Sequence, residues 1–183
     1  MFIMTVNQQP LHKKRMLAMT TESGGLPMVK KILVAVDDSE NAGRAVNFLA
    51  DNFKRDFEIT LFSVVPDTET LCEMESPALT PYFRARQSDF CALEDQKKII
   101  VQKALDGARD NLVEKGFSAD HITVKLQTRK RGIARDIVEE SGDGYDLIVM
   151  GRRGISGVRE FFLGSISQKV LHLAPDMTVL IVN

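Results

Sequence analysis

The chain has 183 residues, with 24 Lys or Arg against 25 Asp or Glu, so its formal net charge is −1. This balance argues against nucleic acid as a partner, because nucleic-acid-binding domains normally carry a marked positive excess. No run of about 18 apolar residues occurs, so the sequence predicts no membrane-spanning helix. The two cysteines, Cys72 and Cys91, form no CxxC pair, and the three histidines are scattered. This pattern argues against a zinc site and favours a reducing, cytoplasmic compartment.

The first 28 residues differ from the rest of the chain because they show no sustained hydrophobic periodicity. The basic cluster at 13–15 follows only a weakly apolar stretch, whereas a secretory signal places its charges before the apolar core. We therefore expect a mobile N-terminal extension at 1–28, or a start site placed too early, since Met28 directly precedes the first clear strand. A targeting or interaction arm is the alternative. Residues 29–183 are expected to form one domain.

From residue 31 onward, short apolar runs alternate with amphipathic stretches. The runs, rich in β-branched residues and typical of strands buried on both faces, lie at 32–36, 59–65, 122–126, 146–150 and 178–182. The stretches with helical spacing lie at 42–53, about 91–115, 133–141 and 166–174. This order predicts an α/β fold with a five-stranded, parallel, doubly wound sheet and helices on both faces.

Local signals refine this prediction. Ser39 is expected to cap the first helix, and Gly116 to end the second in the left-handed conformation. Ile100 is expected to face inward from the second helix, together with Leu105 and Leu112. The connection at 67–90 has no clear period, and the strand at 122–126 alternates as an edge strand does.

Two strand ends carry residues suited to anion chemistry, and in such sheets ligands bind beyond the carboxyl ends of strands. The first end reads Asp37–Asp38–Ser39, and the second runs from Gly151 through Gly154 to Gly164–Ser165. Glycines allow close backbone approach, and the N–H groups at a helix start attract phosphate. Arg152, Arg153 and Arg159 supply cationic donors. A phosphate site between residues 151 and 165 is therefore physically sensible.

Each of these features also has a purely structural explanation. The glycines can be turn residues, the arginines a solvated face, and the two aspartates caps of the first helix. Ser165 and Gln168 have the spacing of a capping box, which explains both residues without a ligand. Composition and spacing alone leave the two interpretations open.

The glycine spacing resembles a known nucleotide-binding pattern. Gly151-x2-Gly154-x9-Gly164-Ser165 is similar to the G-x2-G-x9-G-[S/T] pattern of ATP-binding universal stress proteins. The strands at 31–37, 146–151 and 179–182 resemble the family's first, fourth and last strands, in that order. The resemblance covers residues 29–183 and implies a sheet of the adenine nucleotide alpha hydrolase type, with strand order 3-2-1-4-5.

The resemblance also implies roles for individual residues. Asp37 matches the acidic residue near the ribose and the phosphate-bound metal, Mg²⁺ or Mn²⁺, and Ser39 matches the capping serine. The other implied contacts to ATP fall on apolar walls and on the phosphate loop: Ala35, Val64, Met150, Gly151, Arg153, Gly154, Gly164, Ser165 and Ile166. Two positions depart from the family pattern: Asp38, where many members have an uncharged residue, and Ser63, where many have histidine.

Rival nucleotide folds lack their signatures here. No GxxxxGK[ST] occurs, no GxGxxG follows the first strand, and only two Tyr and no Trp are present to stack on a flavin. Ser23–Gly24–Gly25 is similar to the loop of ATP pyrophosphatases but precedes the first strand.

The sequence therefore predicts an ATP-binding universal stress protein that acts as a nucleotide-dependent regulatory or stress-response module. No histidine or glutamate accompanies the glycine loop as a general base, so no catalytic residue is assigned and any hydrolysis is expected to be slow. A slow ATPase or phosphotransferase and a nucleotide-free interaction protein are the alternatives. The resemblance further implies a homodimer that pairs through the strand at 178–182, if that strand lies at the sheet edge.

Overall fold

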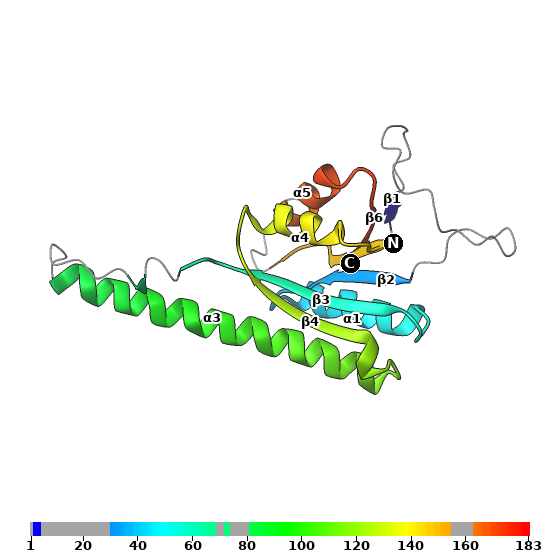
Figure 1. Cartoon of the computed structure of the whole chain (residues 1–183), viewed down its shortest axis with the longest axis horizontal. Helices are drawn as coiled ribbons and strands as arrows, with labels where there is room; N and C mark the ends of the chain where they lie inside the picture. The colour runs from blue at the N-terminus through cyan, green and yellow to red at the C-terminus, as the bar shows by residue number, and fades with distance from the viewer. Residues whose placement is uncertain (1, 5–29, 69–71, 74–80, 155–162) are drawn as a thin grey trace, which may run out of the picture.

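The structure is a computed structural model that describes residues 2–4, 30–68, 72–73, 81–154 and 163–183. Strands and helices alternate through the chain as the sequence predicts (Figure 1). The strands are β1 (Phe2–Met4), β2 (Lys31–Ala35), β3 (Glu58–Val65), β4 (Ile122–Thr128), β5 (Leu147–Gly151) and β6 (Thr178–Val182). The helices are α1 (Glu40–Asn52), α3 (Pro81–Glu114), the short 3-10 turn η1 (Ala119–His121), α4 (Ile133–Ser141) and α5 (Ser165–Leu173).

One sheet holds all of these strands in the order β1-β6-β5-β2-β3-β4. The neighbours from β6 to β4 pair in parallel, which confirms the predicted five-stranded order and the edge position of β4. β2, β3 and β5 lie inside the sheet, and their burial on both faces explains their nearly continuous apolar sequences.

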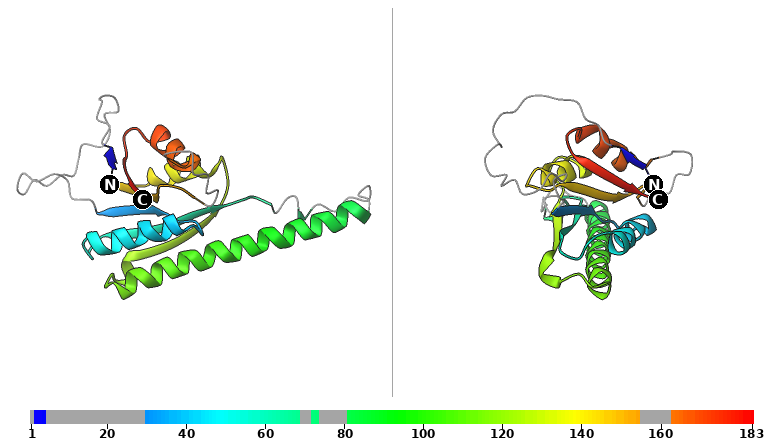
Figure 2. Two further views of the ribbon diagram at one scale, coloured as in Figure 1. Left: turned by 180° about the vertical axis from the view of Figure 1, so that it is seen from behind. Right: turned by 90° about the vertical axis from the view of Figure 1, so that its right-hand side faces the viewer.

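Two helices cover each face of the sheet. Figures 1 and 2 show α1 and α3 on one face, and α4 and α5 on the other. Leu49 of α1 and Leu105 and Leu112 of α3 are fully buried in the first layer. Ile137 of α4 and Val170 of α5 fill the second layer. The sheet is therefore sandwiched between two apolar layers, and its carboxyl edge stays open between them.

The predicted caps form at two helix ends. The Ser39 hydroxyl accepts a hydrogen bond from Ala42 N at 3.2 Å, which makes Ser39 the N-cap of α1. Gly116 follows α3 with φ at 94°, and Phe117 N–H donates to the Leu112 carbonyl at 3.0 Å. A residue without Cβ is favoured at such a positive φ, so Gly116 ends α3 as predicted.

The prediction for α3 was wrong in two respects. The helix begins at Pro81, ten residues before the predicted start, and its Pro81 end projects beyond the sheet (Figures 1 and 2). Proline suits a first helical position because its missing N–H would have no partner there. Ile100 was expected to face inward but is 48% exposed. The inward face of this part of α3 is formed by Val101, Ala104 and Ala108 together with Leu105 and Leu112, and Ile100 lies beside that face.

Cys72 and Cys91 form a disulfide whose Cα atoms lie 5.8 Å apart. The bond ties the connection after β3 to the projecting half of α3. It is at odds with the predicted reducing compartment, since disulfides persist in oxidising surroundings. The spacing of 19 residues does not predict this disulfide, because the sequence did not place Cys91 inside a helix that begins at Pro81.

The outer edge of β6 is not free. Phe2–Met4 pairs with it antiparallel, with Ile3 opposite Leu180. These three apolar residues belong to the predicted extension, and their pairing was not anticipated because three residues show no period. The position of β6 as the last parallel strand agrees with the prediction, whereas its expected exposure as an edge does not. The division at residue 28 stays a prediction.

Candidate functional site

A crevice opens beyond the carboxyl ends of β2 and β5, where the winding of the sheet reverses. From β2 the chain passes through α1 to β3 on one side, whereas from β4 it returns through α4 to β5 on the other. The two connections leave a gap between them, which is the usual ligand position in doubly wound sheets. A pocket of about 500 Å³ fills this gap.

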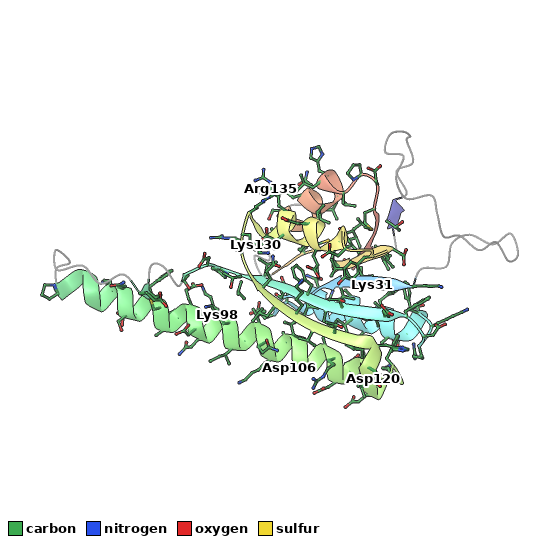
Figure 3. The ribbon with its side chains drawn as sticks, in the orientation of Figure 1. Lys31, Lys98, Asp106, Asp120, Lys130 and Arg135 are labelled. Atoms are coloured by element: carbon green, nitrogen blue, oxygen red, sulfur yellow. A yellow bond between two sulfur atoms is a disulfide. The ribbon has the colours of Figure 1, made fainter. Side chains whose placement is uncertain are left out.

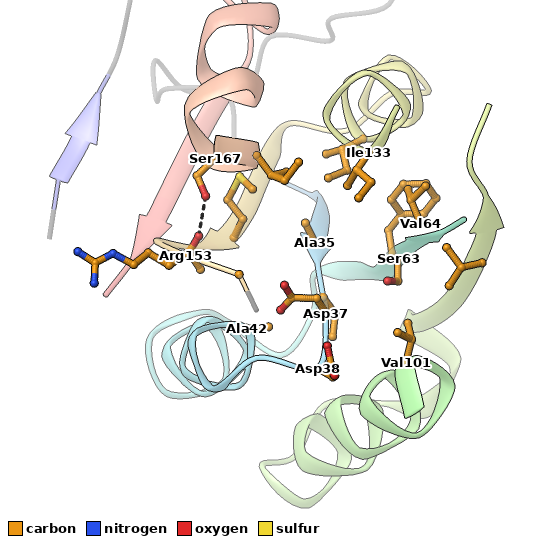
Figure 4. A pocket seen from close by; sticks show the side chains of 18 of the residues that line it. Ala35, Asp37, Asp38, Ala42, Ser63, Val64, Val101, Ile133, Arg153 and Ser167 are labelled. Atoms are coloured by element: carbon orange, nitrogen blue, oxygen red, sulfur yellow. Dashed lines mark hydrogen bonds between the residues drawn. The ribbon is translucent and has the colours of Figure 1, made fainter. Parts of the chain in front are cut away.

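Most of the predicted binding residues meet in this pocket (Figure 4). Eight of the eleven line it: Ala35, Asp37, Val64, Met150, Gly151, Arg153, Gly154 and Ile166. Figure 4 shows Arg153 and Ser167 on one side, and Val64 and Ile133 across the cavity from them. The walls around Ala35 and Val64 are apolar, so they suit a flat, weakly polar ring.

Asp37 is held in a fixed orientation at one end of the pocket. Its Oδ1 accepts hydrogen bonds from the backbone N–H of Ser39, at 3.1 Å, and from the Ser39 hydroxyl. Ser39 therefore orients this carboxylate while it also caps α1, although its side chain does not line the pocket. Asp38 lines the pocket too and is exposed. Two carboxylates at one end favour a cation beside any bound phosphate.

The glycines after β5 permit two close approaches. A Cβ on Gly151 would lie 2.7 Å from the backbone carbon and oxygen of Asn41, so a side chain there would displace the start of α1. A Cβ on Gly154 would lie 2.7 Å from Asp37 Oδ2, which shows that the loop passes directly against this carboxylate. Gly151 thus serves packing between β5 and α1, whereas Gly154 keeps the space beside Asp37 open.

The start of α5 differs from the predicted capping box. Gly164 is the N-cap and Ser165 the first helical residue, and no side chain of the described residues caps the helix. Gln168 N–H donates to the Gly164 carbonyl at 2.9 Å, so Ser165 and Gln168 do not cap each other. Gly164 and Ser165 do not line the pocket, and Ser165 is exposed. Within the part of the chain that the structure describes, the first N–H groups of α5 have no capping side chain, so they are suited to an anion.

Several pocket residues were missed by the sequence reasoning. Ser167 is buried, and its hydroxyl donates to the carbonyl oxygens of Gly151 at 3.0 Å and Arg152 at 3.3 Å, which fixes α5 to the end of β5 (Figure 4). The sequence feature that could have pointed to Ser167 is its position two residues after Ser165, the serine of the glycine motif. Lys97 and Val101 reach the pocket from α3, and no local pattern predicts that approach. The predicted Arg159 lies outside the described residues.

Binding of a metal ion in this pocket would require a bound nucleotide to supply further oxygen ligands. Within the described residues, no group of three or more His, Cys, Asp or Glu side chains gathers to hold an ion. Mg²⁺ commonly binds through one or two carboxylates, substrate phosphates and waters. Asp37 and Asp38 fit that description, so the residues present suit a cation that arrives with a nucleotide.

Comparison with known proteins gives the family. The model of the universal stress protein family matches residues 28–183. The chain belongs to the universal stress protein family. It is 31% identical over 148 residues to universal stress protein YxiE of Bacillus subtilis, a match that covers 80% of this chain and 95% of that protein.

Solved universal stress proteins share the fold. UspA from Lactobacillus plantarum aligns with a TM-score of 0.63 and 23% identity, over 85% of this chain and 98% of that one. A universal stress protein solved in complex with cAMP aligns with a TM-score of 0.52 and 17% identity, over 85% and 97% of the two chains. Both likenesses confirm the doubly wound architecture. Among the described residues of this chain, no helix has the length and apolarity to cross a membrane.

Proposed function

We propose that this universal stress protein binds ATP together with a divalent cation, Mg²⁺ or Mn²⁺, in the pocket beyond β2 and β5. The observation that carries the proposal is the juxtaposition of Asp37 with the glycine loop at one end of an otherwise apolar cavity of about 500 Å³. This volume falls within the range of small-ligand pockets. In this proposal the adenine lies between Ala35 and Val64.

The phosphates would lie between Gly154 and the start of α5, with Arg153 beside them. The N–H groups at the start of α5, which no described side chain caps, and the positive end of the helix dipole favour negative charge there. Asp37 would hold the cation, because a carboxylate beside a polyphosphate is repelled unless a cation lies between them. The relative solved with cAMP supports an adenine nucleotide as the class of ligand.

We propose that nucleotide occupancy regulates a stress response and that catalytic turnover is not the main activity. The described titratable residues that line the pocket are Asp37, Asp38, Lys97 and Arg153. Lys97 is engaged by Glu94 at 2.6 Å, and Asp37 by Ser39. None of them is placed as a general base beside a nucleophile, so any hydrolysis would be slow. A steady-state ATPase rate near the enzyme median of roughly 10 s⁻¹ would contradict this proposal.

The direct test is to identify the nucleotide that copurifies with the full chain. Mass spectrometry of the denatured protein should release ATP, and titration of the emptied protein with ATP, ADP and cAMP should rank ATP first when Mg²⁺ is present. Loss of the ATP preference on removal of Mg²⁺ would support the role of Asp37. A protein that releases no nucleotide and binds none would instead be an interaction protein.

We also propose a homodimer that pairs through β6, and a cytoplasmic location where the Cys72–Cys91 bond would be largely reduced. Pairing with a second chain would require Phe2–Met4 to leave Val179–Ile181. Light scattering should therefore show a dimer for a chain that starts at Met28, and a smaller dimer fraction for the full chain, whose dimer has twice the monomer mass of 20.4 kDa. Equal dimer fractions would show that β1 does not compete for this edge.

A further inference from the structure

The loop between β4 and α4 gathers four positive charges beside the pocket. Arg129, Lys130, Arg131 and Arg135 fall within seven residues, and all four are exposed. Within the described residues, the side chains of Arg129, Lys130 and Arg135 form no ion pair. Arg131 reaches Glu139 only at 3.9 Å, with both side chains more than half exposed. These cations are therefore largely uncompensated.

The backbone that presents these cations is fixed. Arg129 N–H donates to the Val65 carbonyl at 2.7 Å, which ties the loop to the end of β3. Asp136 is 1% exposed and accepts from Lys130 N–H at 2.8 Å and from Arg131 N–H at 2.9 Å. The buried carboxylate thus holds the main chain, while the cationic side chains point to solvent. Such a preformed loop loses little conformational entropy when it binds a partner.

The charges lie where they disfavour the fold. Three consecutive cations repel one another, and Arg135 lies in the first turn of α4, where the helix dipole disfavours positive charge. The N-cap, Gly132, has φ at 128° and gives no side-chain hydrogen bond, and Asp136 is the acidic residue of the first turn. Residues that break local rules without a structural gain mark sites kept for another purpose. These exposed cations therefore favour a partner of opposite charge.

The cationic loop adjoins the open side of the pocket. Ile133, two residues after Arg131, lines the pocket and is 38% exposed. Figure 3 shows Lys130 and Arg135 where β4 passes into α4, on the side of the sheet toward which the parallel strands end. Lys97 lines the pocket from α3. Asp37 and Asp38 line the same pocket.

We propose that the loop of Arg129, Lys130, Arg131 and Arg135 is a docking site for an acidic peptide segment of a partner protein. Guanidinium groups bind carboxylates with two parallel hydrogen bonds, and exposed Ile133 offers an apolar contact beside them. A nucleic acid fits less well. Four cations are fewer than the roughly six to ten phosphate contacts of many nucleic-acid binders, and Asp37 and Asp38 would repel a long polyanion.

The test measures binding of a fluorescein-labelled hexaglutamate peptide to the full chain by fluorescence anisotropy at low salt. One variant carries Arg129→Gln, Lys130→Gln and Arg135→Gln. A control removes the same charge from exposed lysines elsewhere, with Lys54→Gln, Lys103→Gln and Lys169→Gln. The loop variant should bind roughly tenfold more weakly, as expected for the loss of three exposed ion pairs, and the control within about twofold of the unchanged protein.

The outcomes separate the alternatives. Equal weakening in both variants would overturn the proposal, because it would show attraction by net charge alone. Absence of hexaglutamate binding at low salt would also overturn it. Tighter binding of single-stranded hexathymidylate than of hexaglutamate would assign the loop to nucleic acid. The peptide titration contains no nucleotide, so its result does not depend on ATP binding, and urea unfolding measured separately shows whether each variant is folded.

Discussion

Replacing Gly151 with alanine is expected to destabilise the protein, because the added methyl group has nowhere to go. Its Cβ would lie 2.7 Å from the backbone carbon and oxygen of Asn41, atoms that move only if the start of α1 moves. Overpacking of this kind costs about 1–3 kcal/mol, and the intrinsic preference of a strand for alanine over glycine offsets about 0.5–1 kcal/mol. We therefore expect a net loss of about 1–2 kcal/mol.

Gly43→Ala is the matched control. Gly43 lies inside α1, and a Cβ there would meet nothing within 4 Å. The same chemical change should stabilise the protein by up to about 1 kcal/mol, because alanine is the better helix former. Urea unfolding of both variants measures the two free energies directly. A Gly151→Ala variant as stable as the unchanged protein, beside a Gly43→Ala variant with the expected gain, would refute overpacking against Asn41.

Three further predictions concern other contacts. Ser39→Ala removes the cap of α1 and the support of Asp37, so it should cost about 1 kcal/mol in urea unfolding and weaken ATP binding, whereas an unchanged ATP affinity would separate Asp37 from the site. Burial raises the pKa of Tyr145 above its ordinary value of 10.0. The folded state therefore holds this proton more tightly, and its stabilising effect is present below about pH 10 and lost as the pH rises further. Tyr145→Phe should flatten that loss. Reduction of the Cys72–Cys91 bond should lower the free energy of unfolding by about 3 kcal/mol, and no change in the midpoint would contradict a constraint on the unfolded chain.

Much of the fold was predictable from the sequence because its parallel strands are buried on both faces. β2 and β5 carry the unbroken apolar runs that such burial demands, and the face of α1 repeats at helical spacing with a serine cap. The projecting half of α3 was not predictable, since no packing partner imposes a period on it. The pairing of Phe2–Met4 was missed because a three-residue strand depends entirely on the edge it meets.

The candidate site was predictable where local motifs form it. Asp37 and the glycines after β5 meet because parallel strands end at one edge of the sheet. Lys97 and Val101 could not be found this way, because they reach the pocket only through the packing of α3 across the sheet. The motif also did not predict the exact start of α5, because glycine and serine are both common N-cap residues and the sequence does not distinguish Gly164 from Ser165.

Isothermal titration of the full chain with Mg²⁺ and ATP tests the central claim most directly, when it is run beside Gly154→Val and Gly107→Val. A Cβ at Gly154 would lie 2.7 Å from Asp37 Oδ2, whereas a Cβ at Gly107 in α3 would meet nothing within 4 Å. We predict one ATP per chain for the unchanged protein and for Gly107→Val, and at least about tenfold weaker binding for Gly154→Val. Equal affinity in all three proteins would contradict the assigned site, and no binding to the unchanged chain would contradict nucleotide binding itself.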